Sequence, residues 1–96
     1  MRQAYIVTYD VCDPKRLREV FKIMKGYGEH LQLSVFRCEL GARELVELRG
    51  KLSGALNERE DQVLFVDMGP VDGRGRECIT SLGLPYVPAD DAPVIA

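Results

Sequence analysis

A single carboxylate stands where the first apolar segment of the chain ends. Residues 4–9 are rich in β-branched and aromatic side chains, which favours a strand, and Asp10 follows them directly. Carboxylate oxygens are ligands of Mg²⁺, and the two copies of Asp10 in a two-fold dimer would share one ion. Such a metal would supply a Lewis acid and an activated water for phosphodiester hydrolysis. The alternative is that Asp10 only ends the strand and shapes the turn into Asp13 and Pro14.

Basic side chains recur at helical spacing just after this turn. Their intervals of three and four residues place them on one face of a helix. The row consists of Lys15, Arg18, Lys22 and Lys25, and Arg16 lies near its edge. A row of this kind matches the phosphates of a nucleic acid, which supply affinity without reading the sequence. An ordinary solvated helix face is the alternative, because Lys and Arg are common on surfaces.

Three further arginines complete the predicted nucleic-acid contacts. Arg37 belongs to the apolar segment 31–40, and Arg74 and Arg76 alternate with glycines in the segment 72–76. Glycine gives that segment the freedom to mould to a phosphate, although a simple turn also accounts for it.

The composition excludes several classes of protein. The 96 residues, with an apolar fraction of 46% and a charged fraction of 29%, indicate one globular domain, and no segment is apolar enough for a membrane span. We therefore expect a cytoplasmic protein. The net charge is −2, but residues 1–40 carry seven basic and five acidic side chains, which allows a basic face. The three cysteines and the one histidine lie at long spacings that match no zinc-site motif, and we expect the thiols to be interior.

The first helix has clear start and stop signals. It is predicted from Pro14 to about Lys25, because Asp13 can cap its free amides and proline is tolerated at the first helical position. Gly26 and Gly28 supply the stop.

The segment 31–40 cannot be one flat strand. Its apolar side chains occupy odd positions up to Val35 and even positions from Phe36, whereas the side chains of a strand alternate faces with a period of two. A bulge or a break into two strands is therefore expected near these two residues. The rest of the chain predicts a helix at 42–56, a strand at 63–68 and a short strand at 77–82.

These elements define an α/β (α+β) ferredoxin-like βαββαβ sandwich with an extra C-terminal edge strand at residues 1–82, followed by an extended tail at residues 83–96. Two helices cover only one face of such a sheet, while strands such as 63–68 are apolar on both sides. A second copy of the chain is the simplest cover, which predicts a homodimer. In the tail, Val94 and Ile95 are expected to dock on a partner protein or on the dimer mate.

Two short segments carry a resemblance to a known family. The first, YDVCDPKR, contains Tyr9 and Asp10, and the second, QLSVFRCEL, follows the predicted helix. The matching residues of the second segment are Gln32, Ser34, Val35 and Phe36. With this spacing, over about residues 4–68, the chain resembles the CRISPR-associated protein 2 family, whose sheet is broken at the second segment.

The resemblance implies a ferredoxin-like homodimer that is a structural, nucleic-acid-binding subunit of the CRISPR spacer acquisition complex. The implied partners are the CRISPR-associated integrase (CRISPR-associated protein 1), double-stranded spacer DNA and a CRISPR-associated exonuclease. Some members of the family are described as metal-dependent endonucleases. The alternative is therefore a Mg²⁺-dependent endonuclease that cleaves single-stranded RNA or double-stranded DNA, with Asp10 at a metal shared across the dimer.

Overall fold

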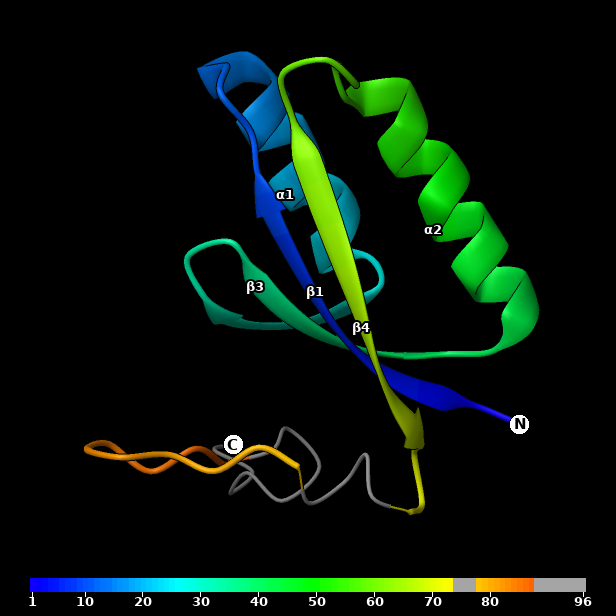
Figure 1. The fold of residues 1–96 in the computed structure, drawn as a ribbon, viewed down its shortest axis with the longest axis vertical. Coiled ribbons are helices and arrows are strands. Elements are labelled where there is room, and N and C mark those ends of the chain that lie inside the picture. The colour runs from blue at the N-terminus through cyan, green and yellow to red at the C-terminus, as the bar shows by residue number, and fades with distance from the viewer. Residues whose placement is uncertain (74–77, 88–96) are drawn as a thin grey trace, which may run out of the picture.

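Four strands and two helices form the described part of the chain, which comprises residues 1–73 and 78–87 of a computed structural model. The elements are β1 (Gln3–Asp10), α1 (Pro14–Lys25), β2 (Gly28–Gln32), β3 (Val35–Leu40), α2 (Ala42–Ala55) and β4 (Gln62–Pro70). The sheet has the order β2-β3-β1-β4, and every neighbouring pair is antiparallel. Each helix thus connects two parallel strands with a third strand between them, which confirms the ferredoxin-like arrangement (Figure 1).

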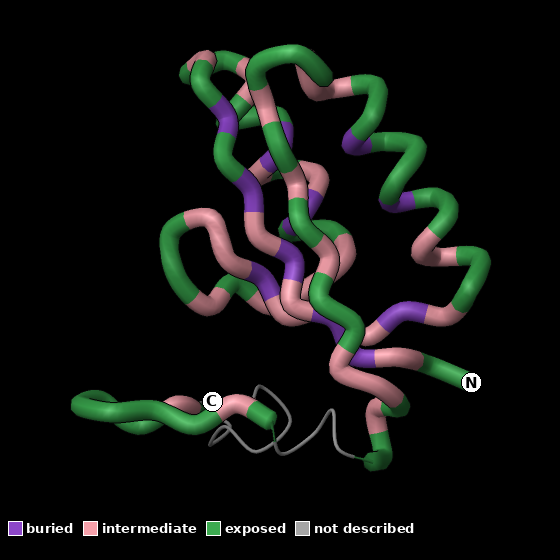
Figure 2. The backbone as a smooth tube through the Cα atoms, in the orientation of Figure 1, coloured by how far each residue is buried: buried purple, intermediate pink, exposed green. Residues whose placement is uncertain are grey.

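The core lies between the sheet and the helices because the strands alternate between buried and more exposed side chains. On the central strand β1, Tyr5, Val7 and Tyr9 are buried against the helices, and the side chains between them point to the opposite face. Figure 2 shows the same alternation along β1 and the buried positions on the inner sides of the helices. Those helical positions are Val20, Met24, Leu48 and Leu52.

The predicted break within 31–40 is confirmed, because the chain turns back at Leu33 and Ser34 between β2 and β3. Beyond the turn, Val35 is only half-buried whereas Phe36 is fully buried in the core. The change of phase in the apolar pattern therefore marks a hairpin rather than a bulge within one strand.

The first strand of this hairpin begins at Gly28, earlier than the apolar pattern indicates. A Cβ atom at Gly28 would lie 2.6 Å from the carbonyl oxygen of Arg37 and 2.5 Å from the sulfur of Cys38. The missing side chain therefore permits the close approach of β2 to β3, and Gly26 alone ends the helix.

The short strand expected at 77–82 is not formed at residues 78–82, and residue 77 lies outside the described part of the chain. The segment instead passes beside β2, where the Tyr86 hydroxyl donates a hydrogen bond of 3.3 Å to Glu29. The amide of Tyr86 donates a hydrogen bond of 3.0 Å to the Ser81 hydroxyl. This amide is therefore bonded within its own segment and not to a neighbouring strand.

Only one of the three cysteines is buried. Cys38 is buried, and its burial raises the pKa of the thiol to about 11, so it stays protonated and unreactive. Cys12 and Cys78 are exposed, contrary to expectation, because both lie in irregular segments outside the sheet and helices.

The face of the sheet opposite the helices carries apolar side chains in partial contact with solvent. Leu64 and Val66 on β4 are 51% and 50% exposed, and Ile6 and Val35 lie half-buried on the neighbouring strands. We call Ile6, Val35, Leu64 and Val66 the open face. Within residues 1–73 and 78–87, no helix combines the length and apolar character required to cross a membrane.

We expect a second copy of the chain to cover the open face. Replacing Leu64 and Val66 together with Glu would place two charges in that contact, where burial without partners is costly. Light scattering on the purified protein should give a dimer for the wild type and a monomer for the double variant. Val46→Glu is the matched control, because Val46 is 70% exposed on α2, away from this face. A dimer that survives the double substitution would place the contact elsewhere.

Candidate nucleic-acid interface

The sequence positions α1 by a capped start and a defined end. The Asp13 carboxylate accepts a hydrogen bond of 2.9 Å from the amide of Arg16, and Pro14 needs no amide partner at its position. At the other end the amide of Gly26 donates to the carbonyl of Ile23 at 3.0 Å. The predicted helix is therefore confirmed, and the direction of its outward side chains is fixed.

The basic row keeps its charges available on the outside of α1. Its members, Lys15, Arg18, Lys22 and Lys25, are all exposed. Across the described residues, Lys15, Arg18 and Lys22 form no ion pair. The Nζ atom of Lys25 lies 5.6 Å from the centre of the Phe21 ring, a cation–π contact that leaves the charge at the surface. The row is thus a line of accessible cations on a rigid element.

Arg16, predicted at the edge of the row, is engaged with a different part of the chain. Its Nε donates to one carboxylate oxygen of Asp61 at 2.7 Å and its Nη2 to the other at 3.1 Å. The same Nη2 lies 3.3 Å from Glu60. This bidentate pair joins the start of α1 to the loop before β4. Arg16 therefore has a structural contact, and we leave it out of the proposed nucleic-acid surface.

Asp61 is enclosed by four hydrogen-bond donors. Besides Arg16, the amide of Cys12 donates at 3.1 Å and the amide of Asn57 at 2.9 Å. The Arg16 guanidinium, helped by these amides, holds the pKa of the Asp61 carboxyl well below its usual range. The sequence did not single out this residue, because it is 45 positions from Arg16 and carries no local motif.

Asp10 is exposed at the end of β1, opposite Gln62 of β4. Since Tyr9 points toward the helices, the alternation of the strand directs Asp10 toward the open face. In the described residues no group of three His, Cys, Asp or Glu side chains is close enough to hold a metal. The predicted shared Mg²⁺ site therefore depends on a second copy of the chain, which would bring a second Asp10.

The two segments that carry the family resemblance meet beside α1. The amide of Tyr9 donates to the carbonyl of Ser34 at 3.1 Å, and the rings of Tyr9 and Phe36 stack with their centres 6.2 Å apart. Burial raises the pKa of the Tyr9 phenol, and a hydrogen bond with the Ser34 side chain acts in the opposite direction. Tyr9 is therefore a neutral hydrogen-bonding group at physiological pH.

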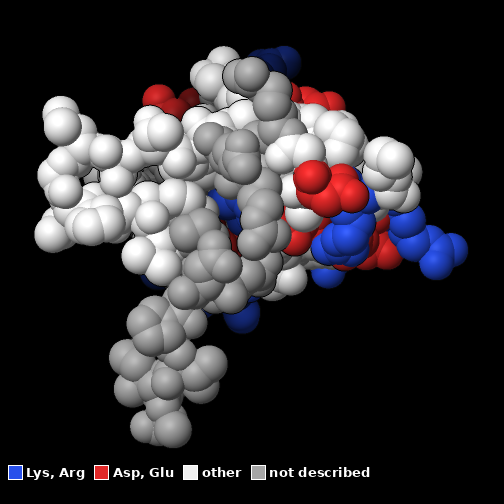
Figure 3. All heavy atoms as spheres, turned by 90° about the horizontal axis from the view of Figure 1, so that it is seen from below, with Lys and Arg blue, Asp and Glu red and all other residues white. Residues whose placement is uncertain are grey.

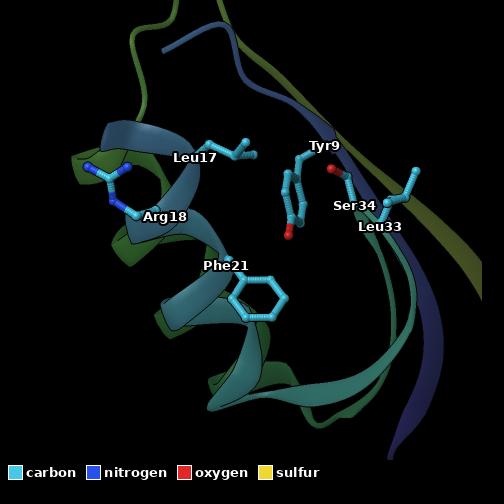
Figure 4. A pocket seen from close by; sticks show the side chains of 6 residues that line it. All are labelled: Tyr9, Leu17, Arg18, Phe21, Leu33 and Ser34. Carbon is cyan, nitrogen blue, oxygen red and sulfur yellow. The ribbon is translucent and has the colours of Figure 1, made fainter. Parts of the chain in front are cut away.

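Tyr9 also forms one wall of a pocket of about 490 Å³ between α1 and the β2–β3 turn. The other lining residues are Leu17, Arg18, Phe21, Leu33 and Ser34. In Figure 4 the Tyr9 ring stands between Leu17 on one side and Ser34 with Leu33 on the other, and its hydroxyl points toward Phe21. Sequence reasoning missed Leu17 and Leu33 as site residues because isolated leucines resemble core positions.

The remaining predicted contacts lie away from the basic row or outside the described residues. Arg37 is on β3, where its Nη1 forms an ion pair of 2.7 Å with Glu39. Seen from the side of residues 78–87, basic and acidic groups adjoin one another and much of the visible surface is uncharged (Figure 3). The contacts predicted at Arg74, Arg76, Val94 and Ile95, like the end of the tail, fall outside the described residues.

Fold and surface together define a small ferredoxin-like α+β protein with a cationic helix. A model of the family CRISPR associated protein Cas2 matches residues 3–72. The CRISPR-associated endoribonuclease Cas2 1 of Rhodospirillum rubrum is 46% identical over 69 residues, which cover 72% of this chain and 68% of that protein. The CRISPR-associated endoribonuclease Cas2 of Geobacter sulfurreducens is 36% identical over 88 residues, 92% of each chain.

Solved structures show the same fold. A crystal structure of a hypothetical protein from Thermus thermophilus superimposes with a TM-score of 0.77 at 33% identity, covering 92% of this chain and 99% of that one. The crystal structure of Streptococcus pyogenes Cas2 gives a TM-score of 0.73 at 33% identity, covering 83% and 99%. The chain belongs to the CRISPR associated protein Cas2 family, as the two sequence segments predicted.

The contact between Arg16 and Asp61 predicts a specific pH dependence of stability. The Asp61 pKa is depressed in the folded state relative to about 3.9 in an unfolded chain, so the contact stabilises fully above that value and is lost as the pH falls below it. Asp61→Asn should lower the urea midpoint at pH 7, and its difference from the wild type should narrow below about pH 4.

Asp72→Asn is the matched control, because Asp72 is an exposed carboxylate in a turn. Its urea midpoint should stay close to that of the wild type at every pH. A difference between Asp61→Asn and the wild type that is the same at neutral and acidic pH would contradict the predicted coupling.

Proposed function

We propose that the protein is a nucleic-acid-binding structural subunit of the CRISPR spacer acquisition complex. In this role a homodimer bridges two dimers of the CRISPR-associated integrase on double-stranded spacer DNA. The observation that carries the proposal is the basic row, whose accessible cations lie on a rigid, capped helix. Membership of the Cas2 family places this surface in a CRISPR context.

The dimensions of the row suit a phosphate backbone. At about 1.5 Å per residue, the row from Lys15 to Lys25 is about 15 Å long. Duplex DNA carries about one charge per 1.7 Å of its axis, so this length faces several phosphates. The side chains are long and flexible, and helix faces of this kind contact phosphates without reading bases. Affinity on this surface is therefore independent of sequence, as capture of varied spacer DNA requires.

A dimer through the open face would present two such rows. The helices lie on the other side of each sheet, so both rows would remain on the outside of the dimer. Integrase contacts are expected at the tail, through Val94 and Ile95, and a CRISPR-associated exonuclease is a further partner in this proposal. The bridging role thus depends on the dimer more than on any single residue.

Neutralising the row tests the proposed DNA binding. Lys15, Arg18 and Lys22 replaced together with Gln should weaken binding of a short DNA duplex and reduce the slope of log affinity against log salt by about one for each lost phosphate contact. Fluorescence anisotropy at several salt concentrations measures both quantities. The triple variant Arg43→Gln, Arg49→Gln, Arg59→Gln removes the same charge from exposed positions elsewhere and should leave the slope unchanged. Equal effects of the two triple variants would reject the row as the binding surface.

A second candidate function is a Mg²⁺-dependent endonuclease. Two observations favour it: Asp10 is exposed and directed toward the open face, and the named relatives are called endoribonucleases. If the two-fold axis of the dimer passes near the ends of the two β1 strands, both copies of Asp10 can bind one ion. That ion would polarise the phosphate and supply the attacking water, on RNA or on double-stranded DNA.

Asp10→Asn separates the two functions. Asn keeps the shape and the hydrogen bonds of the turn but is a poor ligand for a hard cation, and the dimer would lose both charged ligands at once. We expect spacer integration in a reconstituted reaction with the integrase to survive, and any Mg²⁺-dependent cleavage by the isolated dimer to disappear. Loss of integration, with the dimer and the DNA affinity intact, would give Asp10 a catalytic part in adaptation and overturn the scaffold role.

A further inference from the structure

The pocket beside Tyr9 lies next to the basic row but has a different chemistry. Its walls are mainly apolar, formed by two aromatic rings and two leucines from β1, α1 and the β2–β3 turn. Its volume of about 490 Å³ falls within the range of about 300–1,000 Å³ that small-molecule sites occupy. Binding of phosphates by the basic row does not require an apolar pocket of this kind.

Polar groups inside the pocket and cations outside it limit the occupant. The Tyr9 hydroxyl points toward Phe21, and Ser34 adds a second hydroxyl group beside the Tyr9 side chain (Figure 4). Arg18 lies at the rim, with its guanidinium directed away from the Tyr9 ring (Figure 4). The flanking residues of the row, Lys15 and Lys22, are exposed. An occupant therefore needs a flat apolar body, edge atoms that form hydrogen bonds, and a negative charge outside the pocket.

The turn that closes the pocket is held in an unfavourable backbone conformation. Leu33 has a φ of 20°, which is unfavourable for a residue with a Cβ atom, and its apolar side chain is 89% exposed to water. The His30 ring contacts the Leu33 carbonyl at 2.8 Å, and the Tyr9 amide binds the next carbonyl. Both contacts hold the backbone of the turn beside the pocket. Strain of this kind is found at ligand sites more than at ordinary turns.

We infer that the pocket binds one unpaired nucleobase of a nucleic acid whose phosphates lie on the basic row. Unstacked bases are recognised by aromatic side chains and by hydrogen bonds to their edges, and Tyr9, Phe21 and Ser34 supply both. The cations at the rim favour a nucleotide over an apolar protein side chain, which would gain nothing from the hydroxyl groups and would face unpaired charges. The inference rests on the proposed nucleic-acid binding and adds to it a preference for an unpaired end or bulge.

The test compares two probes on the purified dimer. One is a blunt DNA duplex, and the other is the same duplex with one unpaired 2-aminopurine at an end. The unpaired base should increase the affinity about five- to a hundredfold, the range expected for one stacked base, and its fluorescence should fall on binding. Leu17→Trp fills the pocket, and Leu33→Ser removes an exposed apolar side chain that lines it. Both variants should abolish this gain in affinity and leave the affinity for the blunt duplex unchanged.

Val46→Ser is the matched control for Leu33→Ser, because Val46 is an exposed aliphatic side chain on α2 and should retain the full gain. If the wild type binds the blunt duplex and the unpaired base does not increase the affinity, the pocket does not bind a base. The proposed phosphate contacts of the basic row would then be retained. If neither probe binds, the proposed function fails as well. Pocket variants that keep the gain but no longer bind the integrase would show that the pocket takes a protein side chain, which also overturns the inference.

Discussion

The alternation of side chains along β1 is the constraint on which the rest of the molecule depends. Because successive residues of a strand point to opposite faces, Tyr9 joins the helix-covered core while Asp10 is directed to the open face. Two neighbouring residues thus serve two separate surfaces. One surface combines the basic row with the apolar pocket, and the other combines a carboxylate with an apolar sheet. In the proposed function, a nucleic acid on the first surface and a second chain on the second would not compete for space.

The loop contacts fix these surfaces relative to each other. Asp61 receives donors from Arg16, Cys12 and Asn57, so a single carboxylate joins the end of β1, the start of α1 and the beginning of β4. The start of the helix that carries the basic row and the turn that follows Asp10 are therefore held at the same point. A substitution of Asp61 would therefore affect both surfaces, although Asp61 belongs to neither of them.

The sequence predicted the parts of the structure that follow from local rules. The cap at Asp13, the break of the segment 31–40 and the basic row all come from spacing within a few residues. All three are present, the break as a turn at Leu33 and Ser34. The role of Arg16 and the pocket at Leu33 were missed because each depends on residues brought together by the fold. The absent strand at 78–82 shows the reverse case: an apolar segment has strand character, but no sheet edge pairs with it within the described residues.

The position of the basic row on α1 has an evolutionary consequence. Lys22 and Lys25 lie in the last turn, where positive charge favours the helix through its dipole, typically by about 0.3–1 kcal/mol each at exposed sites. Substitutions that weaken a binding surface usually leave stability unchanged or improve it, which lets them spread when binding is not needed. Here the same substitutions also weaken the helix, so selection for folding helps to retain the cations. A surface of this kind can persist through periods in which its ligand changes or is absent.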